Sequence, residues 1–228
     1  MTSLPIRHTK TMSTLTKLAL GKMGRLRPRP LLAEASRVIV LPAPERQGGA
    51  TLTTALAARQ SSRAFAAREL PLALLSSLLW AANGVNRADG GRTAPSAMNA
   101  QEIAIFVALA GGAFRYDAPA HRLELVAARD VRRVTGYQDF VDDAPMDLVY
   151  VADHTRMHLV PVHKRAPYAY TAAGAIAQNV YLYAAANGLA TVIRAWIDRD
   201  AIAEALGLTH DEDVLLSQTV GYPADGNA

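Results

Sequence analysis

Residues 169–187 read AYTAAGAIAQNVYLYAAAN, and Gly188 follows directly. Alanines and larger apolar residues fill most of these positions and leave little polar surface, which is typical of a helix buried on most sides. A glycine after such a run is a common helix end, because it adopts left-handed backbone angles without strain. The stretch therefore predicts a central helix of about 18 residues.

Short β-rich segments lie on both sides of this helix. Their apolar and β-branched residues predict strands at 103–110, 113–116, 121–126, 146–152, 191–197 and 214–220. The first three segments read as an antiparallel hairpin or meander, and 146–152 reads as a buried strand. Helical patterns are found at 130–138 and 200–206. Strands and helices mix with at least one antiparallel connection, which predicts the α+β class.

The N-terminal part divides near Thr51. Thr51 can cap a short helix over 52–58, and Pro71 opens an amphipathic helix that ends at Asn83-Gly84. Before Thr51, the first 33 residues carry seven Lys or Arg and no acid, and prolines and glycines then make an extended lead-in. We therefore expect a basic N-terminal arm and lead-in over 1–50 and one folded domain over 51–228.

Composition excludes several classes of protein. The 228 residues include no cysteine, so disulfides, thiolate nucleophiles and Cys-ligated metal centres are ruled out. Any redox chemistry must use a bound cofactor. No apolar run approaches the roughly 20 residues that a membrane-spanning helix needs. The basic arm lacks the interleaved aromatic residues of a single-strand binder, so no nucleic-acid partner is expected.

The common catalytic signatures are also missing. No Gly-x-Ser-x-Gly, P-loop or Gly-x-Gly-x-x-Gly is present, which disfavours a serine hydrolase, a nucleoside triphosphatase and a Rossmann dehydrogenase. His154 and His158 have the spacing of a zinc helix, with His163 as a third candidate. The general-base glutamate is absent and arginines flank the histidines, so no metal site is predicted.

Two polar segments are candidates for binding an anionic or heteroaromatic ligand. Arg59-Gln60-Ser61-Ser62-Arg63 offers two guanidinium forks and two hydroxyls at a helix end, the donors that suit a phosphate. Pro95-Ser96-Ala97-Met98-Asn99 places a hydroxyl and an amide in a rigid loop that can hydrogen-bond a heteroaromatic edge. Such clusters are more often solvated surface than binding sites, so neither segment alone defines a site.

Together, the order and separation of these segments resemble the nitroreductase superfamily over about 175 residues, 51–223. The sequence looks closest to the SagB/ThcOx-like branch of thiazoline and oxazoline dehydrogenases. Residues 173–179 resemble the family's central dimer helix, 188–191 the turn after it, and 220–223 its closing strand. The resemblance implies a mainly antiparallel sheet flanked by helices in an intertwined homodimer.

The resemblance also implies an activity. A cytoplasmic, FMN-dependent oxidoreductase is expected, which moves hydride between NADPH or NADH, or a substrate, and a small acceptor such as a nitroaromatic, quinone, enone or azoline. The alternative is a flavin-binding or flavin-sequestering protein of the same fold. A non-enzymatic binding module with a basic arm is the third possibility. No catalytic acid or base can be assigned, since water or substrate can supply the proton.

The same resemblance implies which residues would hold the flavin. In one subunit they are Arg59, Gln60, Ser61 and Arg63; from the other subunit come Pro95, Ser96, Ala97 and Asn99. Backbone N–H groups of Ile193, Arg194 and Ala195 would lie against the flavin N5 and stabilise its reduced form. Trp196 replaces a common glycine, and residues 224–228 lack the usual Lys or Arg, so phosphate binding would depend on Arg59 and Arg63.

Overall fold

A seven-stranded sheet with the order β2-β5-β4-β3-β7-β9-β8 runs through the middle of the computed structural model, which describes residues 12–30 and 35–224. Every pairing in this sheet is antiparallel, which confirms the predicted sheet type. The strands are β2 (Val38–Val40), β3 (Ile103–Leu109), β4 (Gly112–Asp117), β5 (Arg122–Ala127), β7 (Met146–Asp153), β8 (Ala190–Arg194) and β9 (Glu212–Gly221). A separate two-stranded sheet joins β1 (Arg29–Pro30) to β6 (Arg129–Asp130).

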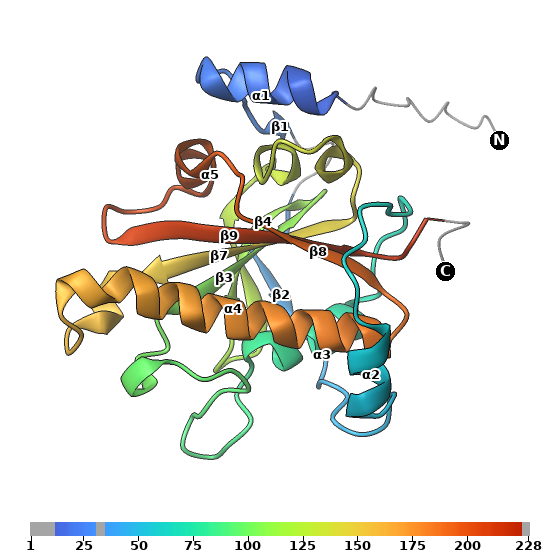
Figure 1. Cartoon of the computed structure of the whole chain (residues 1–228), viewed down its shortest axis with the longest axis vertical. Coiled ribbons are helices and arrows are strands. Elements are labelled where there is room, and N and C mark those ends of the chain that lie inside the picture. Colours follow the sequence, from blue (N-terminus) through green and yellow to red (C-terminus); the bar gives the residue numbers. More distant parts are fainter. Residues whose placement is uncertain (1–11, 31–34, 225–228) are drawn as a thin grey trace.

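Helices cover both faces of the large sheet (Figure 1). On one face lie α2 (Leu52–Ala58), α3 (Leu72–Asn83) and α4 (Val162–Ala186); on the other lie α1 (Thr14–Lys22) and α5 (Arg199–Leu206). The α+β class is therefore confirmed. Strand β7 is almost wholly buried because it lies in the interior of the sheet, with packed layers on both faces. This position explains why Leu148 to Ala152 are continuously apolar instead of alternating.

The long helix α4 differs from its prediction at the start and on one face. It begins at Val162, not at Ala169, and passes through Pro167, whose missing N–H removes only one helical hydrogen bond. Its buried residues recur at helical spacing and pack on the sheet and α3: Ala169, Ala172, Ala173, Ile176, Ala177, Val180, Tyr181 and Ala184. The opposite face, which includes Tyr170 and Gly174, is exposed in the single chain. Burial on most sides is therefore not achieved within one chain.

Three other local predictions need correction. Residues 130–138 form no α-helix but only a 3₁₀ turn at Arg132–Val134, because Asp130 accepts hydrogen bonds from the Arg132 backbone and side chain. Strand β8 ends at Arg194, so Ile197 lies outside it. Pro71 precedes α3 as its N-cap instead of occupying the first helical position.

The described part of the N-terminal arm packs on the domain. The Lys17 side chain is completely buried, pairs with the equally buried Asp142, and donates to the Gln138 carbonyl over 3.1 Å. Arg29 also bonds Asp142, with 2.8 Å between its Nη1 and the backbone carbonyl. Strand β2 of the lead-in pairs with β5. Residues 1–11 and 31–34 lie outside the described residues. No helix in the described ranges combines the length and apolar character that crossing a membrane requires.

Candidate functional site

The first polar segment leaves the C-terminal end of α2 and turns along the buried face of α4. Arg59 is the C-cap residue of α2, and its guanidinium lies over the Tyr181 ring, 5.3 Å from the ring centroid. The Ser61 hydroxyl is 2.9 Å from the Tyr181 hydroxyl. Tyr181 therefore fixes both ends of the Arg59-Gln60-Ser61 segment.

Tyr181 also links this segment to strand β8. The Ile193 N–H donates to the Tyr181 hydroxyl over 3.0 Å, and the Ser62 N–H donates to the Thr191 carbonyl, also over 3.0 Å. The loop after α2 thus binds the free edge of β8. Sequence reasoning took Tyr181 for a core residue of an apolar helix. The one available signal was its hydroxyl, which needs a partner when buried.

The structure separates the three residues predicted along β8. The Ile193 N–H, expected to face a flavin, is already bonded to Tyr181. The Arg194 side chain lies on the other face of the sheet, buried, with 2.6 Å between its Nη2 and Asp147 Oδ1. Ala195, just after the strand, is exposed. The exposed Trp196 packs its ring against Tyr137, with centroids 5.6 Å apart.

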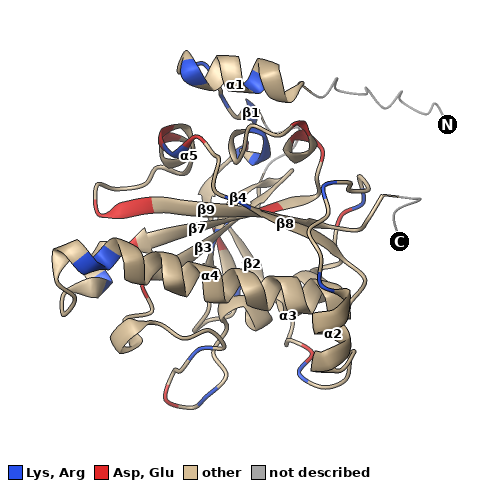
Figure 2. Ribbon diagram, viewed as in Figure 1, with Lys and Arg blue, Asp and Glu red and all other residues tan. Residues whose placement is uncertain are grey.

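Arginines recur along the loop that rises from α2 (Figure 2). Gln60 and Arg63 are exposed, and the Arg68 guanidinium lies 4.0 Å from the centroid of the Tyr222 ring. The bridge between Phe65 and Pro223 holds the end of the chain against this loop. Among the described residues, Arg59, Arg63 and Arg68 form no ion pair with a carboxylate. The loop carries three arginines and one acid, Glu69, so it presents a net positive surface. Sequence reasoning missed the contribution of Arg68.

The second polar segment has an unusual backbone. Ser96 accepts a hydrogen bond from the Gln101 N–H over 2.9 Å, and the turn between them includes the 3₁₀ helix Ala97–Asn99. Met98, Asn99 and Gln101 have φ angles of 55°, 52° and 50°, which non-glycine residues seldom adopt. Such strain persists only where surrounding contacts enforce it, and it is often found at binding sites. Pro95 and Asn99 are exposed at this turn.

One chain does not bring the two polar segments together. Asn99 and Met98 line a hollow with His158 and Val160, next to the N-terminal end of α4. Arg59 and Ser61 contact Tyr181, near the C-terminal end of the same helix. Roughly 28 Å of helix axis separate Val162 from Tyr181 at about 1.5 Å per residue. The two segments lie at opposite ends of α4, as Figure 1 shows.

The histidines of residues 154–163 do not form a metal centre. His154 Nε2 lies 2.7 Å from Asp213 Oδ2, and the segment around it is a 3₁₀ turn, not an α-helix. Because the turn lacks the α-helical spacing, His154 and His158 do not share a helix face. No cluster of three or more His, Asp or Glu with metal-binding geometry occurs in the described ranges.

Comparisons with known proteins give a consistent result. The model of the Nitroreductase family matches residues 56–222. A protein of Methanocaldococcus jannaschii, named as a nitroreductase, is 30% identical over 151 residues, which are 62% of this chain and 76% of that protein. A crystal structure from Ralstonia eutropha, also named as a nitroreductase, is 50% identical with a TM-score of 0.84, covering 88% of this chain and 96% of that one.

A more distant solved structure shares the fold. It is the NADPH:FMN oxidoreductase of Vibrio harveyi complexed with NAD⁺, which is 21% identical and has a TM-score of 0.55. The match covers 77% of this chain and 70% of that chain.

Proposed function

The chain belongs to the nitroreductase family, and from this premise we propose that it is an FMN-dependent oxidoreductase. The observation that carries the proposal is the loop after α2. It presents three arginines without carboxylate partners in the described chain, beside a serine held by Tyr181. This donor set meets the requirements of a terminal phosphate, which takes bidentate guanidinium donors and small hydroxyls.

The residues present fit a flavin mononucleotide. Arg59, Ser61 and Arg63 would hold the phosphate and the polar edge of the flavin, and Gln60 would add an amide. Arg68, which lies in the same loop and contacts the Tyr222 ring, would supply the cation that residues 224–228 lack. Bound FMN would supply hydride transfer between NADPH or NADH and a nitroaromatic, quinone, enone or azoline.

The chain's own groups would position the cofactor and substrate. Because Tyr181 uses the Ile193 N–H, we assign the backbone donor toward the flavin to Ala195, which lies beyond that hydrogen bond. Trp196 and Tyr137 form an aromatic contact directly after it and would bound the substrate space. The buried side chain of Arg194 would hold this backbone in place from the far side of the sheet without touching the ligand.

We propose that two chains build each flavin site in a homodimer. Large apolar side chains are exposed at both ends of α4: Leu52 (65%) and Leu56 (52%) at the α2 end, and Met98 (64%), Leu159 (65%) and Val162 (76%) at the other. A twofold axis across the exposed face of α4 would bury both sets. It would also place Pro95, Ser96, Ala97 and Asn99 of one chain beside Arg59 of its partner.

The finer assignments rest on the sequence resemblance. The SagB/ThcOx-like branch and, with it, an azoline as one candidate substrate are proposed on the resemblance of residues 51–223. A cytoplasmic location is proposed on the family resemblance alone.

Flavin sequestration without NAD(P)H oxidation is the competing function, and stopped-flow mixing with NADPH separates it from oxidoreductase activity. Rapid loss of flavin colour is expected for an oxidoreductase, whereas a sequestering protein would keep its colour.

We predict that the purified protein is yellow and releases FMN, not FAD, on heat denaturation. The arginine loop suits a terminal monophosphate, and an adenylate extension would need further contacts. Chromatography of the released flavin beside both standards makes the measurement. A colourless protein that also fails to take up added FMN contradicts the proposal.

We expect Arg59→Ala to weaken FMN binding by about 10- to 100-fold, because a hydrogen bond to a charged group contributes about 1.5–3 kcal/mol. Titration of FMN into the apo variant measures the loss. Arg129→Ala is the matched control, since Arg129 is an exposed arginine in β6, away from α2. His154→Ala should likewise leave the affinity unchanged. Equal losses in Arg59→Ala and Arg129→Ala would show that the phosphate lies elsewhere.

A further inference from the structure

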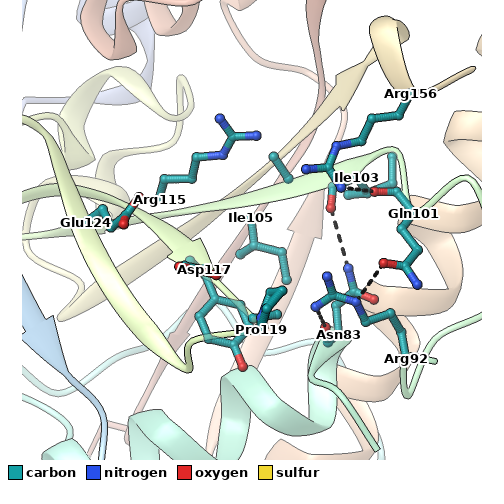
Figure 3. A pocket seen from close by; sticks show the side chains of 13 residues that line it. Asn83, Arg92, Gln101, Ile103, Ile105, Arg115, Asp117, Pro119, Glu124 and Arg156 are labelled. Atoms are coloured by element: carbon teal, nitrogen blue, oxygen red, sulfur yellow. Dashed lines mark hydrogen bonds between the residues drawn. The ribbon is translucent and has the colours of Figure 1, made fainter. Parts of the chain in front are cut away.

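A second hollow adjoins the Ser96–Gln101 turn at Gln101 and is lined by residues of α3, β3, β4 and β5. Its volume is about 390 Å³, within the range of roughly 300–1,000 Å³ that is usual for small-molecule sites. Figure 3 shows Arg92, Gln101 and Arg156 on one side, and Arg115 and Glu124 on the other. None of the residues predicted for flavin binding lines it.

Arg92 is the charged group of this cavity that lacks a charged partner. Its Nε donates to Gln101 Oε1 over 3.0 Å, and its Nη1 donates to the Asn83 carbonyl over 3.3 Å. Both acceptors are neutral. Burial lowers the pKa of Arg92, the direction expected for a cation that is partly desolvated without a counter-ion.

The acids around the cavity are already paired. Asp117 and Glu124 bind Arg122, with N–O distances of 3.2 Å and 2.6 Å. Asp153 lies 3.3 Å from Arg156 Nε and 4.0 Å from Arg115 Nη2. Glu102 is fully buried beside the wall, and burial raises the pKa of its carboxyl, which favours the neutral form. The cavity is lined by three arginines (Arg92, Arg115 and Arg156) and two acids (Asp117 and Glu124), so its lining carries one surplus positive charge.

The remaining wall is apolar and aromatic. Ile103, Ile105 and Tyr116 are all buried and contribute to the lining, together with Ala104, Ala118 and Pro119. The Tyr116 ring is fixed because its hydroxyl lies 2.9 Å from His121 Nδ1. The cavity therefore combines a rigid apolar wall with one guanidinium that is held in place by neutral acceptors.

We propose that this cavity binds a small monocarboxylate with an apolar or aromatic body. The carboxylate would pair with the remaining N–H groups of Arg92, and the body would lie on Ile103, Ile105 and Tyr116. A single surplus charge matches one carboxylate, whereas a dianionic phosphate would leave one negative charge without a partner. The site does not depend on the proposed flavin chemistry. It adjoins the Ser96 turn through Gln101, whose N–H bonds Ser96 and whose side chain bonds Arg92.

Isothermal titration calorimetry with benzoate tests the proposal on the full-length protein as purified. We expect one benzoate to bind per chain, and the uncharged isostere benzamide to bind at least about tenfold more weakly. Phenyl phosphate should also bind more weakly than benzoate. Arg92→Gln should weaken benzoate binding about tenfold or more. Arg87→Gln, an exposed arginine on the same loop that does not line the cavity, should change it less than about twofold.

Several results would overturn the assignment. The assignment is wrong if benzoate and benzamide bind with equal affinity, if phenyl phosphate binds more tightly than benzoate, or if Arg92→Gln leaves benzoate binding unchanged. Benzoate that alters the visible absorbance of bound flavin and is insensitive to Arg92 would lie over the flavin instead. If Arg92→Gln does not fold, Arg156→Gln replaces it, because the Arg156 side chain is 46% exposed. Arg156→Gln should weaken benzoate binding about threefold, and unchanged binding would count against the site. Calorimetry reads binding with or without flavin, so this proposal and the flavin proposal fail separately.

Discussion

Co-refolding a chain that carries Arg59→Ala and Arg63→Ala with one that carries Asn99→Gly is expected to restore about a quarter of wild-type flavin binding. Each variant alone should bind little flavin at a concentration chosen just above the wild-type Kd. In a mixed dimer, one site collects all the lesions and the other is built from unmutated segments. Random pairing makes about half the dimers mixed, and half the sites in those are intact.

Glycine is the better replacement for Asn99 because the φ angle of that residue is 52°. Alanine would be strained at this angle, whereas glycine removes the side chain without the strain. Flavin fluorescence quenching measures the binding, and distinct affinity tags on the two chains verify that mixed dimers form. If mixed dimers form and no binding returns, one chain builds the whole site and the dimer proposal is wrong.

Replacing Arg194 by methionine is expected to lower the free energy of unfolding by about 3–5 kcal/mol, because it leaves a buried carboxylate unpaired. Arg194 and Asp147 have 4% and 0% exposed side chains, and Arg194 also donates to Thr219 Oγ1 over 2.8 Å. A shape-matched apolar side chain cannot replace these bonds. Urea denaturation of both proteins at neutral pH measures the change.

The pH dependence gives this prediction a specific signature. Burial raises the pKa of Asp147, and Arg194 opposes that rise. In Arg194→Met the pKa of Asp147 in the folded state is raised further above its value in the unfolded state. The loss of unfolding free energy is therefore absent below the unfolded-state pKa of Asp147, and it grows as the pH rises through that value toward the folded-state pKa. The destabilisation should therefore be smaller near pH 4 than at pH 7. The double variant Arg194→Met, Asp147→Leu should recover most of the loss, and equal instability at both pH values would contradict the unpaired-charge explanation.

Sequence patterns predicted most regular elements of this protein, because those elements follow from local preferences. Alternating apolar residues and β-branched side chains predicted strands at 103–110, 113–116 and 121–126. The structure confirms all three, with strand ends that differ by one or two residues. The Thr51 cap was also identified from the sequence, since its hydroxyl accepts from the Thr54 N–H three residues later. The family, too, was recognisable from short segments in a fixed order, and the family model supports that recognition.

Only the tertiary structure decided features that depend on distant partners. Residues 130–138 have helical propensity, but Arg132 pairs with Asp130 and the Arg194 guanidinium packs against Gly136, where a side chain would not fit. Lys17 would be placed at the surface from its sequence context, yet Asp142 and the Gln138 carbonyl, more than a hundred residues away, bury it.

The candidate sites show the same division. Residue types identified Arg59, Ser61 and Asn99 as polar groups able to bind a ligand, since hydrogen-bonding capacity belongs to the side chain itself. The order of segments could not show that Tyr181 organises the first group or that the length of α4 keeps the second group apart from it. The sequence therefore determined which chemical groups this protein carries. Packing of α4 on the sheet decided which of them meet, because distances between residues far apart in the chain are set by that packing alone.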